Sequence, residues 1–114
     1  MGLTTYLAEN AGITIKKIGS LELIALKDAD AFLRAAKYRN VAILGIEGFR
    51  LEANRAIPDM GLIADFSGIP YDDEIVNTTI EEAARFLLGV SSPDVYFDFT
   101  LDEVTSKSDG DVVR

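Results

Sequence analysis

The sequence predicts one small domain of the α+β class, in which a mostly antiparallel sheet of about four to five strands is packed by two main helices. Two segments, residues 29–36 and 80–87, repeat apolar side chains at helical spacing. The segment from Val41 is apolar on both faces, and residues 95–102 alternate strictly between apolar and polar side chains. A chain of 114 residues suits a single core, so we expect residues 1–104 to form one domain.

The N-terminal residues predict short elements. Residues 3–10 carry three apolar side chains on one helical face and precede Gly12, which favours either a short helix or a frayed end. Residues 13–18 and 21–26 are β-prone runs on either side of a Gly-Ser turn. They predict a hairpin, or alternatively a second run that leads directly into the first main helix.

The two main helices have recognisable start signals. Asp28 is the predicted N-cap of the first helix, whose inward stripe follows the i, i+3, i+4, i+7 spacing. That stripe consists of Ala29, Phe32, Leu33 and Ala36. Thr78 and Glu81 match a capping box at the start of the second helix. The second stripe consists of Ile80, Ala83, Ala84 and Leu87.

A long strand is predicted from Val41 to Glu52, because its first half is apolar on both faces, as in a central strand. Residues 53–58 form the predicted turn, since Pro58 cannot donate to a ladder and belongs in a loop or at a strand start. Residues 60–66 then return as a second strand. A short helix that begins at Pro58 is the rival interpretation, because proline suits a first helical turn.

The last predicted strand begins at Val95, and its alternation leaves one polar face. That face consists of Tyr96, Asp98, Thr100 and Asp102. Charges in these positions also suit an ordinary edge strand, where they prevent further strand pairing. Residues 105–114 have no apolar period and predict a flexible C-terminal tail.

The composition excludes several kinds of chemistry. The sequence has no histidine and no cysteine, which removes the usual nucleophile pairs, disulfides and the usual zinc ligands. No apolar stretch approaches the roughly 18 residues that span a bilayer, and the N-terminus does not resemble a secretion signal. We therefore expect a cytoplasmic protein without a metal or cofactor.

The net charge of −8 is unevenly distributed along the chain. Residues 1–55 contain eight basic and six acidic side chains, for a net charge of +2, whereas residues 56–114 contain three basic and 13 acidic ones, for −10. A field of this sign repels nucleic acids and anionic membranes and attracts a basic protein. The same charge can alternatively serve solubility alone.

Glu47 is the acidic residue with the least obvious structural role. Strict alternation places it on the same face as apolar residues of its strand, where a carboxylate must be paired, neutralised or moved outward. A bulge at Gly45 or Gly48 turns it outward. If the hairpin register centres near Arg55, Asp65 lies diagonal to Glu47 and the shared site raises one pKa. Such a pair suits acid–base catalysis or a structural ion pair.

An acidic loop precedes the second main helix. Its three adjacent acids do not have the alternate ligand spacing of a calcium-binding loop, so a solvated loop is expected. An acidic surface with a tyrosine suits docking onto a basic protein. The predicted partner contacts are Asp72, Asp73, Glu74, Tyr96, Asp98 and Asp102.

Four segments together resemble small bacterial proteins of the kind encoded as immunity proteins beside secreted toxins. They are VAILGIEGF, IPDMGLIADFS, EEAARFL and VYFDFTLDE, and the resemblance covers roughly residues 26–104. It implies a tight one-to-one complex with a cognate, often basic, toxin domain. It implies no catalysis by the immunity protein itself and assigns no role to individual residues.

The expected function is therefore that of a non-catalytic, acidic protein-binding domain that neutralises a basic toxin or effector domain. One alternative is a small enzyme or ligand-binding domain that uses Glu47 and Asp65 in a cleft between the helices and the sheet. Another is a homodimeric structural domain, formed by strand pairing along the last strand.

Overall fold

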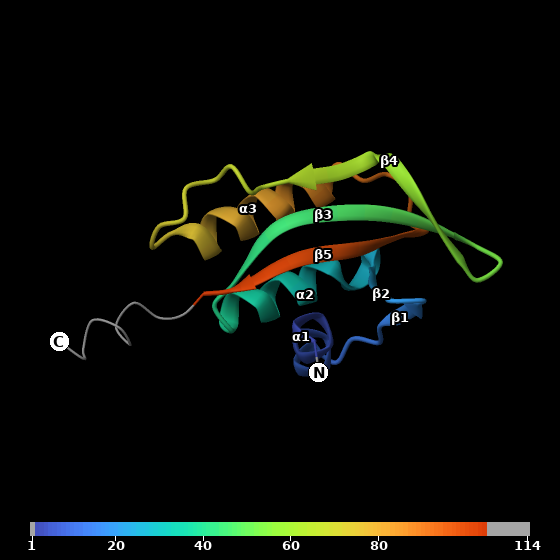
Figure 1. Ribbon diagram of the computed structural model, residues 1–114, viewed down its shortest axis with the longest axis horizontal. Coiled ribbons are helices and arrows are strands. Elements are labelled where there is room, and N and C mark those ends of the chain that lie inside the picture. Colours follow the sequence, from blue (N-terminus) through green and yellow to red (C-terminus); the bar gives the residue numbers. More distant parts are fainter. Residues whose placement is uncertain (1, 105–114) are drawn as a thin grey trace.

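The computed structural model describes residues 2–104 (Figure 1). Its elements, in chain order, are α1 (Leu3–Ala11), β1 (Lys16–Ile18), β2 (Leu21–Ala25), α2 (Leu26–Tyr38), β3 (Val41–Glu52), β4 (Arg55–Asp65), α3 (Ile75–Leu88) and β5 (Val95–Glu103). The predicted α+β class is confirmed, and the short N-terminal helix forms. The tail predicted at 105–114 lies outside the described residues.

The five strands form one sheet in the order β1-β2-β5-β3-β4, and all neighbouring strands are antiparallel. In Figure 1 the long strands β3 and β5 pass in front of α2 and α3, so the viewer looks onto a face of the sheet that these helices do not cover. We call this surface the open face. In the described part of the chain, no helix is long and apolar enough to cross a membrane.

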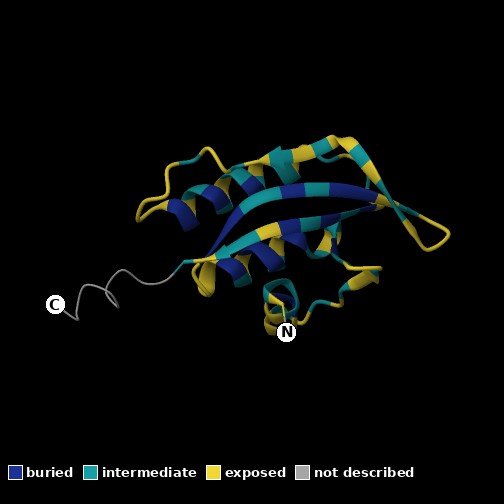
Figure 2. Cartoon of the chain, viewed as in Figure 1, coloured by how far each residue is buried: buried dark blue, intermediate teal, exposed yellow. Residues whose placement is uncertain are grey.

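The main core lies between the helices and the opposite face of the sheet. Phe97 and Phe99 of β5 and Ile46 of β3 are buried there against residues of α1, α2 and α3. The rings of Phe32 and Phe99 pack with their centroids 4.7 Å apart. The predicted stripe of α2 is buried along its whole length, whereas in α3 only Ala83 of the predicted stripe is fully buried. Figure 2 shows this buried side of the helices in dark blue.

Both main helices begin earlier than predicted. The N-cap of α2 is Ala25, and Asp28 lies inside the first turn, where its negative charge suits the helix dipole. The N-cap of α3 is Glu74, so the capping box predicted at Thr78 is wrong. The physical reason is tertiary: Ile75 and Val76 are buried against Ala42 of β3, and that burial extends the helix in the N-terminal direction.

The turn between β3 and β4 contains only Ala53 and Asn54, both with positive φ, rather than the predicted residues 53–58. Pro58 lies within β4, opposite Phe49, so the rival helix at Pro58 is also wrong. Proline is tolerated there because β4 is an edge strand of the sheet.

Both alternatives predicted for residues 13–26 are found in the structure. β1 and β2 form the expected hairpin around Gly19, which adopts a positive φ of 60°. β2 also leads directly into α2, with no loop between them.

The last strand forms as predicted, but inside the sheet. β5 pairs with β3 along its whole length and with β2 at Tyr96 and Phe97. The edge strands are β1 and β4, so the interpretation of β5 as a charged edge strand is wrong. A homodimer formed by pairing along β5 has only the stretch from Asp98 to Glu103 left, on the side of β2.

Candidate functional site

A bulge in β3 decides where Glu47 points. The pairing of β3 with β5 shifts register between Ile43 and Gly45, which leaves Leu44 as an extra residue. Ile43 and Ile46 consequently both lie in the helix-facing core, although they are three residues apart. The bulge therefore places Glu47 on the open face, as one of the sequence alternatives anticipated, and strict alternation through β3 is wrong.

A second, larger irregularity lies between β3 and β4. Gly48 is opposite Asp59, whereas the preceding Glu47 is opposite Ile63, so three residues of β4 are inserted (Met60, Gly61 and Leu62). Beyond the insertion, the register is the one expected from a turn centred near Arg55, although the turn residues themselves are Ala53 and Asn54. The insertion also leaves Met60 76% exposed.

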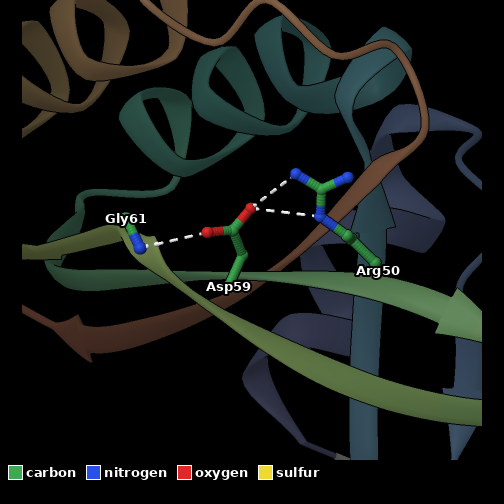
Figure 3. A network of polar contacts seen from close by, with 3 residues as sticks. All are labelled: Arg50, Asp59 and Gly61. Atoms are coloured by element: carbon green, nitrogen blue, oxygen red, sulfur yellow. Dashed lines mark hydrogen bonds and ion pairs between the residues drawn. The ribbon is translucent and has the colours of Figure 1, made fainter.

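Asp59 holds this inserted segment in shape (Figure 3). Its Oδ2 accepts hydrogen bonds from Nε and Nη2 of Arg50, at 3.2 and 3.0 Å. Its Oδ1 accepts one from the backbone N–H of Gly61, at 3.0 Å. Both carboxylate oxygens are thus used inside the β3–β4 hairpin, and the segment that displays Met60 is tied to β3.

The central pair of the open face is Glu47 and Asp98, which are directly opposite each other in β3 and β5. No salt bridge within residues 2–104 neutralises either carboxylate. Asp98 is half-buried, and desolvation raises its pKa, with further contributions from the negative charges of Glu47 and Glu22. The structure therefore places two like charges side by side at a partly buried position.

Replacing Asp98 by asparagine is expected to stabilise the protein near neutral pH. A raised pKa means that the folded state binds the proton more tightly than the unfolded chain, so stability falls as the pH rises from the ordinary value of 3.8 through the folded-state pKa. Above that pKa the variant should be more stable than the wild type by up to about 1 kcal/mol, the range for cross-strand pairs. Chemical denaturation near pH 7 and near pH 3 measures both values.

The gain should disappear at the acidic pH, where the wild-type carboxyl is protonated in both states. Glu103→Gln is the matched control, because it removes an exposed carboxylate from the same strand. An unchanged or lower stability of Asp98→Asn at neutral pH would contradict the assigned electrostatic strain.

Apolar and aromatic side chains flank the acidic pair. Ile63 of β4 lies opposite Glu47, on the side of β3 away from β5, and is 44% exposed. Phe49 and Tyr96 form the next cross-strand pair, with Phe49 buried and Tyr96 half-buried. The acidic pair is therefore bordered by apolar and aromatic side chains of the kind that protein interfaces cover.

The six predicted partner contacts fall into two groups. Tyr96 and Asp98 lie at the centre of the open face, beside Glu47. Asp102 lies two positions beyond Thr100 on the same side of β5, and the Tyr71 hydroxyl donates a hydrogen bond to it. That hydrogen bond raises the pKa of Tyr71 and ties the acidic loop to the end of β5. The remaining contacts, Asp72, Asp73 and Glu74, are exposed in this loop.

The contacts of Asp65 are different from those of the Glu47–Asp98 pair. It is opposite Gly45 and therefore diagonal to Glu47, as anticipated. Hydrogen bonds from the side chain and backbone of Ser67 lower its pKa, so it does not carry the raised value expected of a shared pair. It borders a pocket of about 380 Å³ together with Glu82, and Glu47 is not among the lining residues.

The sequence reasoning missed two features of this surface. The partner of Glu47 is Asp98, which only the strand order brings beside it. The exposure of Met60 and Ile63 was also missed, although Gly61 inside an apolar run is a signal of an irregular strand. Among residues 2–104, no group of three or more acidic residues is arranged to hold a metal ion.

The chain matches no protein-family model, and comparisons with curated proteins and with solved structures give no match.

Proposed function

We propose that this chain is a non-catalytic protein-binding domain whose open face docks a basic patch of a partner protein. The partner would be a toxin or effector domain that the complex neutralises, in the manner of immunity proteins. The observation that carries the proposal is the Glu47–Asp98 pair, two adjacent carboxylates to which the described residues supply no cation.

A partner arginine or lysine at this position would relieve the repulsion between the two carboxylates. Charge-assisted hydrogen bonds are roughly twice as strong as neutral ones, and an arginine fork matches the geometry of a carboxylate. The net charge of −8 would also accelerate the encounter with a basic protein.

The neighbouring side chains supply the apolar part of the contact. Ile63 is exposed opposite Glu47, Met60 is exposed in the inserted segment of the same strand, and Tyr96 lies half-buried on the same strand as Asp98. Protein interfaces combine an apolar and aromatic centre with a polar rim. Asp102 and the loop from Asp72 to Glu74 would form part of that rim.

Titration of the full chain with a short peptide of arginine and leucine, followed by two-dimensional NMR, tests the location of the site. The amides around Glu47 and Asp98 should shift and saturate, and a peptide with glutamate in place of arginine should leave them unchanged. The double reversal Asp98→Lys with Asp102→Lys should weaken binding by about a hundredfold, because it replaces attraction with repulsion at two contacts.

The matched control is Glu81→Lys with Glu103→Lys, which changes the net charge equally at exposed positions on α3 and at the end of β5. This variant should lose much less affinity. Equal losses in the two double variants would mean that only overall charge matters, and would remove the open face from the proposal.

A second candidate function follows from the raised pKa of Asp98 beside Glu47. Two carboxylates that share a proton can act as an acid–base pair, so the enzyme alternative now involves Glu47 and Asp98 instead of Glu47 and Asp65. Small neutral molecules that bind at this pair in an NMR fragment screen, where the cationic peptide does not, would favour it.

A further inference from the structure

A groove of about 640 Å³ lies between α1 and α2, on elements that the proposed function does not use. Ala31 and Ala35 of α2 contribute small side chains to its lining. Asn10 of α1 and three residues at or near the end of α2 complete most of it, namely Arg34, Tyr38 and Arg39. Its volume lies within the range of small-molecule sites.

Arg39 is held in place by three contacts. Its Nη2 donates a hydrogen bond to Oδ1 of Asn10, at 2.7 Å. Its guanidinium carbon lies 5.4 Å from the ring centroid of Tyr6 and 5.3 Å from that of Tyr38, within the range of cation–π contacts. An arginine fixed in this way loses little further freedom when a ligand binds.

Arg39 has no salt bridge to neutralise its charge, a property that it shares with Arg55 among the arginines of residues 2–104. Arg34, Arg50 and Arg85 each form a salt bridge with a carboxylate. No carboxylate within residues 2–104 forms a salt bridge with Arg39, even though acidic side chains outnumber basic ones in the chain. One of its five N–H donors reaches Asn10, and within residues 2–104 the guanidinium makes no other hydrogen bond, so its remaining donors are available to a ligand.

We propose that this groove binds an oxyanion, a carboxylate or a phosphate, that is carried on a flat apolar ring. Arg39 would hold the oxyanion with its remaining donors, and Arg34 would supply a second positive charge. The ring would lie on the alanines of the groove and against Tyr38, which is 82% exposed.

The negative charges near the groove are too weak to prevent an oxyanion from binding there. α1 and α2 both end beside the groove, and each C-terminus carries about half a negative charge. The two guanidinium groups carry two full positive charges. Asp30 pairs with Arg34, but both side chains are largely exposed and four residues apart on one helix, a kind of ion pair that contributes little.

The experiment is an NMR titration of the full chain with phenyl phosphate, benzoate and inorganic phosphate, with benzylamine as the cationic control. The amides of Asn10, Tyr38 and Arg39 should shift and saturate with the two aromatic anions. Phenyl phosphate should bind more tightly than inorganic phosphate, because only the former carries the ring. The tighter of the two aromatic anions identifies the oxyanion that the groove prefers.

Arg39→Gln should weaken binding by about tenfold or more, the scale of one charged hydrogen bond, whereas Lys37→Gln should stay within about twofold. Lys37 is an exposed base on the same helix that does not line the groove. Because Arg39→Gln could also loosen the contact with α1, Ala31→Leu is a second variant. It fills the groove, keeps both arginines and should abolish binding.

Three results would overturn the proposal. The first is that neither aromatic anion saturates the shifts, and the second is that benzylamine or inorganic phosphate produces them as strongly as phenyl phosphate. The third is unchanged binding in Ala31→Leu. None of these results bears on the open face, which has the opposite charge and lies on other elements, so this site and the proposed function fail separately.

Discussion

Replacing Gly48 by alanine is expected to destabilise the fold by about 1–3 kcal/mol, the usual range for overpacking. A Cβ at this position would lie 2.7 Å from Cβ of Leu62 and 3.2 Å from its Cδ1. The first of these distances involves an atom next to the backbone of β4, so the inserted segment itself must move. The smaller conformational entropy of unfolded alanine offsets only about 0.4–1 kcal/mol of the loss. Urea denaturation measures the difference.

Gly61→Ala is the matched control, since it adds the same methyl group in the same hairpin. A Cβ there would approach only Oδ1 of Asp59, at 3.4 Å, an ordinary contact, so stability should hardly change. The double variant Gly48→Ala with Leu62→Ala should recover only the part of the loss that comes from Cδ1 of Leu62, because alanine at position 62 keeps the Cβ that lies 2.7 Å away. Additive losses in that cycle would mean that the two residues do not compete for the same space.

The same change also tests the candidate site. Leu62 belongs to the segment that shifts the register, and this shift places Ile63 opposite Glu47. If alanine at position 48 pushes the segment outward, the apolar border of the acidic pair moves with it. We therefore expect a weaker response of the open face to the cationic peptide in Gly48→Ala than in Gly61→Ala.

Replacing Thr79 by valine is expected to cost about 1–3 kcal/mol, the penalty for leaving a buried donor unsatisfied. β4 ends at Asp65, opposite Gly45, so no strand within residues 2–104 pairs with Ile43 on that side of β3. The Ile43 N–H donates instead to Oγ1 of Thr79, at 2.9 Å, and Thr79 is fully buried. Valine keeps the shape of the side chain and removes the hydroxyl, which accepts from Ile43 and itself donates to the carbonyl oxygen of Val76 at 3.3 Å.

Thr79→Ser is the control, because it retains the hydroxyl and loses only a methyl group. It should retain more stability than valine, and the Ile43 amide should exchange slowly with deuterium, as in the wild type. In Thr79→Val that amide should exchange faster than its neighbours in β3. Equal exchange in all three proteins would show that the hydroxyl does not hold this edge of β3.

Local patterns were sufficient to predict the kind of each element. The stripe from Ala29 to Ala36 is buried in α2, and the alternation from Val95 is a strand with one buried side. Glycine inside a strand marked both irregularities of β3 near Glu47. These features depend on neighbours a few residues away, which the sequence displays directly.

The errors arose where contacts between distant segments decide local structure. The capping box at Thr78 is a valid local signal, yet burial of Ile75 and Val76 against Ala42 begins α3 earlier. Pro58 is a valid turn signal, yet it lies in β4 because that strand has a free edge. In both places tertiary packing outweighs the local preference.

By itself, the sequence determined the α+β class, the acidic second half and the candidate residues Glu47 and Asp98 as separate features. Only the tertiary structure placed them side by side, because β5 inserts between β2 and β3. Side-chain periodicity reports which face of its own strand a residue occupies. It carries no information about which strand lies alongside, since that depends on how all the apolar surfaces are buried together.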